Sequence, residues 1–113
     1  MADSTDSIYS SDALTVMPAR VSSPRASYPE ELRAKGIQGV VIVETVLDVH
    51  GVPEPALTHI LSAPTNGAQF RDEALKVVLR SRFEPGQLDG RPVRVRLQIP
   101  VAWQIGGASL EQV

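Results

Sequence analysis

Residues 91–105 (RPVRVRLQIPVAWQI) constrain the fold more than any other part of this chain. Every second side chain there is apolar and would point to one face of a strand, and these residues are Val93, Val95, Leu97, Ile99, Val101, Trp103 and Ile105. The opposite face would carry Arg94, Arg96, Gln98, Pro100, Ala102 and Gln104. A period of two over this length predicts a long β-strand with one buried face and one face toward water.

Pro100 indicates where this strand lies in its sheet. Proline has no N–H to give to a ladder, so it is found on edge strands or at bulges. We therefore expect the last strand to be an edge strand. An exposed edge has two interpretations: it is a liability that invites unwanted pairing, or it is a site where an extended peptide adds as a further strand.

The composition excludes several classes of protein. The formal net charge is -2, which gives no general attraction to nucleic acid or to a membrane surface. The sequence has no cysteine, which excludes disulfides and thiolate chemistry. It also has no apolar run of the roughly 18 residues that a membrane helix needs, and no signal-peptide pattern at its start. We expect a soluble chain; if the natural protein is exported, its signal and any anchor have been removed.

The chain divides into three parts. Residues 1–27 are rich in serine and lack hydrophobic periodicity, so a mostly disordered segment or linker is expected there. Within it, 13–17 would be either a short accessory strand or a packing arm. Residues 28–105 form the domain, and 106–113 are expected to be a frayed tail.

The domain contains four elements before its last strand. In chain order these are a short helix at 29–35, a strand at 39–51, its return strand at 55–62 and a second helix at 68–82. The short helix has capping-box spacing between Ser27 and Glu30, and Gly36 is placed to close it. The first strand is apolar on both faces, which is typical of a central strand. This order predicts an α+β fold: a three-stranded antiparallel sheet in the order 2-1-3, with two helices packed on one face.

No combination of residues indicates catalysis or a cofactor. His50 and His59 have a spacing that matches no metal-ligand motif. Adjacent acids, such as Asp72-Glu73, stand near helix starts, where the helix dipole explains them. No serine lies in a nucleophile elbow, and there is no glycine-rich phosphate loop. We expect no metal, no cofactor and no enzymatic activity.

Arginines gather near the last strand, and they are Arg80, Arg82, Arg91, Arg94 and Arg96. They form either a solvated strand face and helix end, or a positive rim that steers an acidic partner. Phe83 and Trp103 are core anchors or, if partly exposed, interface hot spots.

An ordered set of short motifs over residues 28–105 resembles the C-terminal domain of TonB-family proteins. The motifs are Tyr28-Pro29, GIQGVV at 36–41, DVHG at 48–51, ILSA at 60–63, Ala74-Leu75, RFEP at 82–85, GRPV at 90–93 and the closing strand to Trp103. The positions that we assign to the family motif are Tyr28, Pro29, Gly39, Gly51, Phe83 and Pro85. Two positions depart from the pattern, because Ser81 stands where an aromatic is frequent and Thr45 where a large apolar residue is frequent.

The resemblance implies a non-catalytic periplasmic domain of a TonB-like energy transducer. Such domains are carried on a spacer from an inner-membrane anchor that works with proton-driven motor proteins. They grip a short peptide, the TonB box, of an outer-membrane transporter by strand addition to the last strand. On this chain the expected partner-binding residues are Val93, Arg94, Val95, Arg96, Leu97, Gln98, Ile99 and Val101.

An alternative is a stand-alone TonB-like envelope module. Its exposed edge would pair with a second copy, giving a homodimer, or with another envelope protein. Neither hypothesis involves nucleic acid. The sequence leaves open which transporter is bound, whether an anchor belongs to the natural protein, and the oligomeric state.

Overall fold

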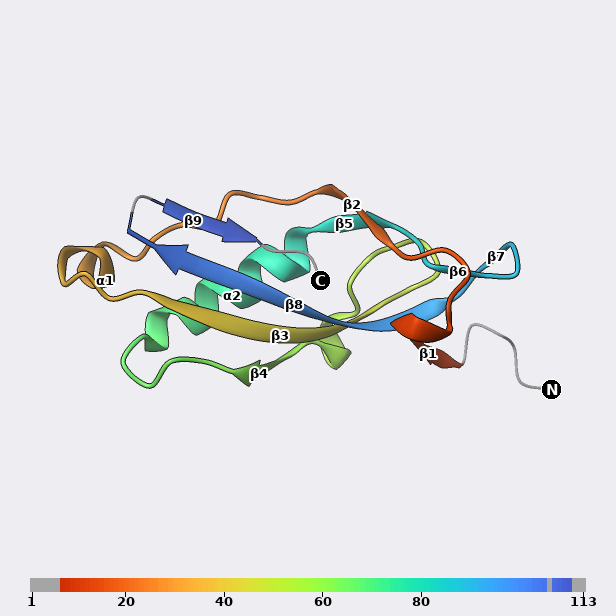
Figure 1. The fold of residues 1–113 in the computed structure, drawn as a ribbon, viewed down its shortest axis with the longest axis horizontal. Coiled ribbons are helices and arrows are strands. Elements are labelled where there is room, and N and C mark those ends of the chain that lie inside the picture. Colours follow the sequence, from red (N-terminus) through yellow and green to blue (C-terminus); the bar gives the residue numbers. More distant parts are fainter. Residues whose placement is uncertain (1–6, 106, 111–113) are drawn as a thin grey trace.

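Two long strands form the axis of the molecule. The structure, a computed structural model, describes residues 7–105 and the backbone of 107–110. The molecule measures 53 × 22 × 20 Å, and β3 (Gly39–Leu47) and β8 (Arg94–Gln104) run along its length (Figure 1). They pair antiparallel without a break, from Gly39 opposite Trp103 to Leu47 opposite Val95. The predicted alternation of 91–105 is therefore built into the centre of the fold.

The main sheet has five strands and is mixed. Its order is β1-β8-β3-β4, and β9 also pairs with β8. β4 (His59–Ser62) and β9 (Gly107–Leu110) run antiparallel to their neighbours, whereas β1 (Ile8–Ser10) is parallel to β8. The sequence instead predicted three antiparallel strands. The two additional strands come from the segments assigned to a linker and a tail, where side-chain periodicity is too short to reveal strands.

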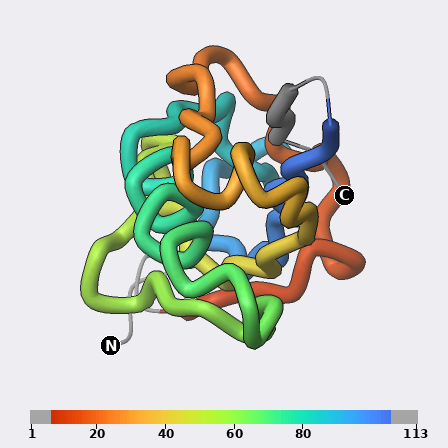
Figure 2. The backbone as a smooth tube through the Cα atoms, turned by 90° about the vertical axis from the view of Figure 1, so that its left-hand side faces the viewer, coloured from red at the N-terminus to blue at the C-terminus, as the bar shows by residue number. Residues whose placement is uncertain are grey.

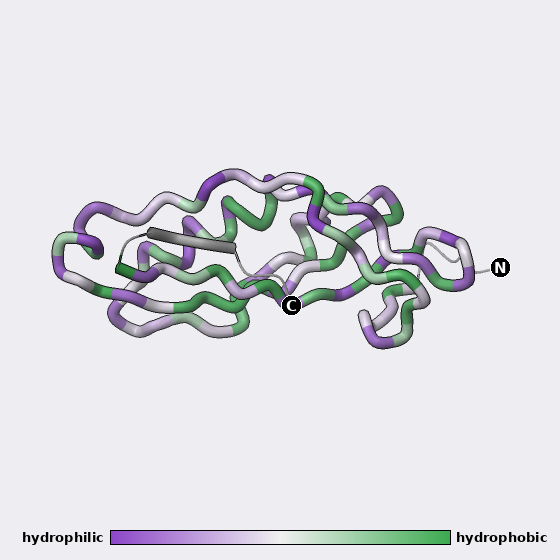
Figure 3. The backbone as a smooth tube through the Cα atoms, turned by 45° about the horizontal axis from the view of Figure 1, so that its top comes forward, coloured by the Kyte–Doolittle hydropathy of each residue, from purple (hydrophilic) through white to green (hydrophobic). Residues whose placement is uncertain are grey.

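Two helices complete the α+β fold. α2 (Ala68–Arg80) runs along one face of the sheet, and α1 (Glu30–Ala34) lies at one end of the molecule (Figure 1). Leu32 of α1 and Phe70 of α2 belong to the same buried cluster as the inward side chains of β3 and β8. Figure 3 shows the hydrophobic residues concentrated in the central strands, with hydrophilic residues mostly in the outer loops.

The ends of α1 match the sequence only in part. Gly36 has φ +69°, and the Ile37 N–H donates to the Leu32 carbonyl at 2.9 Å, which confirms the predicted glycine closure. The predicted capping box is wrong. Pro29 is the N-cap residue, and no side chain caps the helix. Proline is tolerated there because the first N–H groups of a helix have no intrahelical acceptor.

Proline and turn chemistry shorten several of the predicted elements. The strand predicted at 39–51 ends at Leu47, because 48–51 form a turn closed by the Gly51 N–H and the Asp48 carbonyl. The return strand starts only at His59, because Pro55–Leu57 form a 3-10 turn. The predicted helix at 68–82 ends at Arg80, and β5 (Arg82–Glu84) follows it. The last strand is interrupted at Val93, whose N–H donates to the Gly86 carbonyl, so β7 (Arg91–Pro92) is separate from β8.

The segment before α1 is structured where sequence reasoning expected mostly disorder. β2 (Ala19–Ser22) pairs with β5, and Val16 bridges to Gln87 of β6 (Gln87–Leu88), which itself pairs with β7. Viewed along the long axis, this red and orange segment runs around the outside of the domain (Figure 2). Main-chain pairing holds it, which composition cannot reveal. The expectations for 1–6, 106 and 111–113 lie outside the described residues.

Both departures from the family pattern are buried polar residues with partners. Thr45 is 0% exposed, and its Oγ1 lies 2.7 Å from Oγ1 of Thr58. Ser81 is also 0% exposed, and its hydroxyl donates to the Val77 carbonyl at 2.7 Å. A satisfied hydroxyl avoids the penalty of a buried unpaired polar group, so the core accepts both substitutions.

Candidate functional site

The outer edge of β8 is largely covered, which corrects the prediction of a free edge strand. β3 lies on one side of β8. On the other side, β1 pairs with Arg94–Arg96 and β9 pairs with Val101–Gln104. Within residues 7–105 and 107–110, no strand pairs with 97–100 on that side. We call these four residues the edge gap.

The position of Pro100 fixes which main-chain groups face the edge gap. Pro100 lies opposite Ile42 of β3 and has no N–H, so this must be a non-hydrogen-bonded pair. Because pair types alternate along an antiparallel ladder, the even-numbered residues of β8 direct their N–H and C=O groups away from β3. In the edge gap, these groups are the N–H and C=O of Gln98 and the C=O of Pro100.

An open groove of about 510 Å³ lies beside the edge gap. β8 and β3 contribute Glu44, Arg96, Leu97 and Gln98 to its walls. The N-terminal segment contributes Ile8, Tyr9, Ser10, Ser11 and Met17. Main-chain groups without strand partners therefore lie at a hollow that is lined by both apolar and charged side chains. Such a hollow can hold the side chains of an added extended peptide.

The predicted partner-binding residues fall into two groups. Four have side chains that are at most 4% exposed, and these are Val93, Val95, Ile99 and Val101. Their main-chain groups also face β3, or the loop at Gly86 in the case of Val93, so they support the strand without presenting an edge. Arg94, Arg96 and Gln98 direct their main-chain groups outward, and Leu97 is half-buried at the groove.

The arginines of β8 form ion pairs within the domain. Arg94 contacts both carboxylate oxygens of Glu54, at 2.7 and 2.8 Å, and the two side chains are 18% and 26% exposed. Arg96 contacts Glu44 at 3.3 Å, and that carboxylate also lies 3.4 Å from Nε2 of His59. Of the two arginines, Arg96 at 44% exposed is therefore the more accessible to a partner at the groove.

The family-motif residues fix the fold at its two ends. At one end, the Tyr28 hydroxyl donates to the Ile37 carbonyl, and its ring packs edge-on against Phe70. At the other end, the Phe83 N–H donates to the Gly51 carbonyl at 3.0 Å.

The remaining motif residues are also structural. A Cβ at Gly39 would lie 2.4 Å from Cγ of Pro64, so the chain approaches too closely there for a side chain. Pro29 occupies the N-cap position of α1, and the nitrogen of Pro85 lies 3.3 Å from where a Cβ of Gly51 would be. The motif is thus explained by packing and turns.

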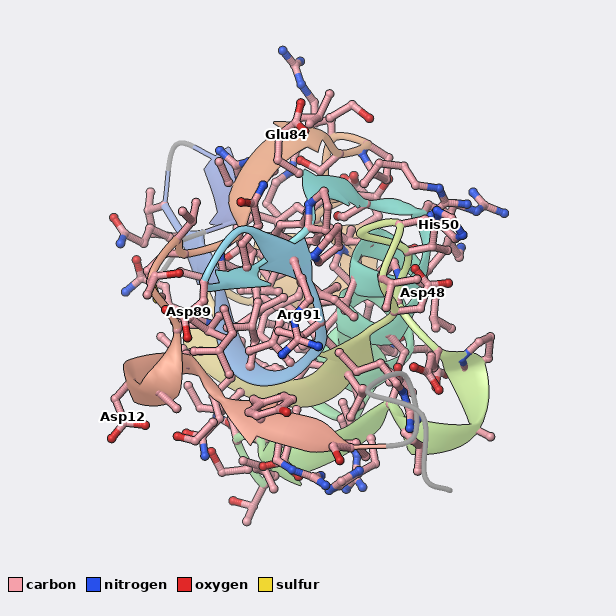
Figure 4. The ribbon with its side chains drawn as sticks, turned by 90° about the vertical axis from the view of Figure 1, so that its right-hand side faces the viewer. Asp12, Asp48, His50, Glu84, Asp89 and Arg91 are labelled. Carbon is pink, nitrogen blue, oxygen red and sulfur yellow. The ribbon has the colours of Figure 1, made fainter. Side chains whose placement is uncertain are left out.

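The charged residues at the β7 end do not converge on a cavity. Figure 4 shows Asp12 and Asp89 on one side of Arg91, with Asp48 and His50 on the other. Asp48 accepts the His50 N–H at 2.8 Å and the Val52 N–H at 3.0 Å, so its carboxylate organises its own turn. Among the described residues, no group of three or more acidic or histidine side chains is placed to hold a metal.

Sequence reasoning missed the contribution of the N-terminal segment to the groove. Ile8 and Tyr9 stand together in a serine-rich stretch, and this pair of residues with high β-propensity was the available signal. It was too short to count as a strand. Pro100 was recognised as an edge residue, but its place in the edge gap depends on where β1 and β9 end.

Two comparisons with known proteins agree with this architecture. The family model described as Gram-negative bacterial TonB protein C-terminal matches residues 24–105. The protein named Protein TonB from Vibrio cholerae serotype O1 (strain ATCC 39315 / El Tor Inaba N16961) is 34% identical over 102 residues. That match covers 88% of this chain and 40% of the relative, so the chain spans less than half of the relative's length. No helix in the described ranges has the length and apolar character for crossing a membrane. On the family match, this chain belongs to the family of TonB C-terminal domains.

Proposed function

We propose that this domain is the peptide-gripping part of a TonB-like energy transducer. It would bind the TonB box of an outer-membrane transporter by strand addition to the outer edge of β8. The observation that carries the proposal is the edge gap, where Gln98 and Pro100 direct main-chain groups outward and Gln98 also lines the groove. An extended peptide placed there would complete the ladder between β1 and β9.

The edge of β8 accepts strands in both directions. β1 is parallel to it and β9 is antiparallel. The backbone of β8 therefore does not restrict the direction of a guest strand, and the side chains at the groove would set that preference. Arg96 lies at the groove beside the half-buried Leu97, so a guest with an acidic residue next to apolar residues fits this surface best.

The edge gap alone would give weak binding. Its three outward groups would contribute about 0.5–1.5 kcal/mol each, and association itself costs several kcal/mol. A useful grip therefore needs the groove side chains or a longer stretch of edge. The cellular setting that we propose follows from the family: the periplasm, with an inner-membrane anchor and motor proteins that act through the rest of the natural protein.

Gln98→Pro is expected to weaken peptide binding by about tenfold without unfolding the domain. The change removes the outward N–H of the edge gap. Pro100 shows that β8 tolerates proline at a position whose main-chain groups point away from β3. Binding would be measured by titrating a panel of peptides, each about ten residues long, from the N-termini of outer-membrane transporters. Thermal unfolding would verify that the variant is folded.

Gln98→Ala is the matched control, because it removes the side chain but keeps the N–H. Equal affinity of Gln98→Pro and the natural domain, with both folded, would contradict strand addition at the edge gap. Sedimentation at two protein concentrations tests the alternative of self-association, in which a second copy pairs with the same edge.

A further inference from the structure

We propose that β1 is a displaceable strand that occupies part of the peptide-binding edge in the free domain. This inference rests on the proposed function and adds a regulation of the same site. β1 pairs with Arg94–Arg96 directly beside the edge gap, and its residues also form one wall of the groove. A guest strand longer than the edge gap must therefore compete with β1 for the same main-chain groups.

The register shows which groups β1 occupies. Ile8 lies opposite Arg94, Tyr9 opposite Val95 and Ser10 opposite Arg96. The outward groups of β8 belong to its even-numbered residues, as Pro100 requires. In a parallel ladder, a residue that hydrogen-bonds across the ladder lies in register with the residue between its two partners. Tyr9 lies opposite Val95, which stands between Arg94 and Arg96, so Tyr9 directs its N–H and C=O toward β8. Release of β1 would expose the outward groups of Arg94 and Arg96 and would extend the open edge over 94–100.

β1 is weakly held compared with the strands at the centre of the sheet. It makes three register pairs with β8, whereas β3 makes nine. Ile8 and Tyr9 are half-buried and Ser10 is exposed, whereas Val41 and Val43 of β3 are 0% exposed. Segments with few buried contacts open at a small fraction of the free energy of global unfolding. β1 can therefore detach while β3 and β8 stay paired.

A second set of contacts can act as the hinge for this movement. The N–H groups of Thr15 and Val16 both donate to the Gln87 carbonyl, at 2.9 and 3.1 Å, and the Gln87 N–H donates to the Val16 carbonyl at 2.9 Å. The Thr15 hydroxyl also accepts the Asp89 N–H at 2.9 Å. Residues 11–13 form a short 3-10 turn with no buried residue between this attachment and β1. β1 can swing outward while 15–22 remain in place.

Tyr9→Pro tests the inference because it removes the N–H that faces β8. If the full edge is open in only a minor fraction of the natural domains, the apparent affinity is reduced by that fraction. Releasing β1 removes this reduction, so we expect affinity for the transporter peptides to rise about tenfold or more. The amide of Arg96, which faces β1, should also exchange with solvent at least about tenfold faster than in the natural domain. Both quantities would be measured by NMR on the full chain.

Two variants serve as matched controls. Ser10→Pro introduces proline at a position whose N–H points away from β8. Ser10 already has φ -72°, which suits proline. Tyr9→Val removes the ring but keeps the N–H. Both should keep β1 in place, so the exchange of the Arg96 amide should stay within about threefold of that in the natural domain. Tyr9 and Ser10 also line the groove, so the peptide affinity of Tyr9→Pro is compared with that of Tyr9→Val, which lacks the same ring but keeps β1 paired.

A reversible disulfide between β1 and β8 tests the opposite change, in which β1 cannot detach. The sequence has no cysteine, so Ser10→Cys with Arg96→Cys creates one possible disulfide between residues that face each other in register. The oxidised protein should bind the peptides at least about tenfold more weakly than the same protein after reduction. The reduced form is its own control for the loss of Arg96.

The outcomes separate this inference from the proposed function. If the natural domain binds peptide, and Tyr9→Pro speeds Arg96 exchange without changing affinity, the regulatory role of β1 is wrong and the grip remains. Equal affinity of the oxidised and reduced double-cysteine protein leads to the same conclusion. If no variant binds any peptide, including the released and reduced forms, the proposed function fails and this inference fails with it.

Discussion

Gly51→Ala is expected to leave the domain unfolded at 25 °C. Gly51 has φ +79°, a conformation that disfavours any side chain. A Cβ there would also lie 1.8 Å from the carbonyl oxygen of Phe83, which is backbone and cannot rotate away. The Phe83 N–H donates to the Gly51 carbonyl, so relieving the clash would break this link between the turn after β3 and β5. The combined cost should exceed the roughly 5–10 kcal/mol that stabilises a domain of this size.

Gly90→Ala separates the two causes of this effect. Gly90 has φ +85°, close to that of Gly51, but nothing lies within 4 Å of where its Cβ would be. This variant should stay folded and lose only about 1–2 kcal/mol, the cost of a left-handed conformation. Urea unfolding followed by the fluorescence of Trp103, the single tryptophan, measures both variants. Similar midpoints for the two proteins would show that the contact with Phe83 is unimportant.

Val95→Asp is the second change that we expect to abolish folding. Val95 is 0% exposed and lies opposite Leu47, which is also 0% exposed. A carboxylate there would be buried among apolar side chains, and burying a charge without a partner costs more than the domain can supply. Circular dichroism and the fluorescence of Trp103 would report the loss of structure. A folded Val95→Asp protein would mean that the inward face of β8 is assigned incorrectly.

Arg96→Glu is the control on the opposite face. Arg96 is 44% exposed, and reversal of its charge places two carboxylates together at Glu44. The cost of this change should stay near 1 kcal/mol, because exposed charges are screened by solvent. Arg94→Glu should cost more, because Arg94 and Glu54 make two contacts and are largely shielded. The alternation pattern places both arginines on the same face, whereas the structure shows that Arg94 is more buried than Arg96.

The side-chain pattern predicted most of the buried face of β8, but it did not predict which strands lie beside β8. Alternation over 91–105 assigned Val95, Ile99 and Trp103 to the buried face, and all three are at most 4% exposed. Two assignments near the end of the strand are wrong: Ile105, placed on the buried face, is 64% exposed, and Ala102, placed on the face toward water, is 1% exposed. Alternation does not report whether the main-chain groups of a strand are paired, so it could not show that β1 and β9 cover the ends of β8. Pro100 was the exception, because the missing N–H is a main-chain property that is visible in the sequence.

The family motif indicated the fold more directly than the site. Gly51, in the turn after β3, contacts Phe83 of β5, and Tyr28 and Gly39 pack around Phe70 at the opposite end. These positions need their residue types for backbone and packing reasons. The candidate site instead depends on main-chain groups of Gln98 and Pro100. Any residue except proline has an N–H, so a motif carries little information about such a site.

The most direct test is the hydrogen exchange of the Gln98 amide, measured by NMR with and without a saturating transporter peptide. In the free domain this N–H points into the edge gap, so it should exchange much faster than the amides between β3 and β8. With peptide bound, its exchange should slow by at least about tenfold, because the guest strand would accept the hydrogen bond. If the peptide saturates the domain while Gln98 keeps its free rate, or if the new protection appears along β4, the guest does not add to β8.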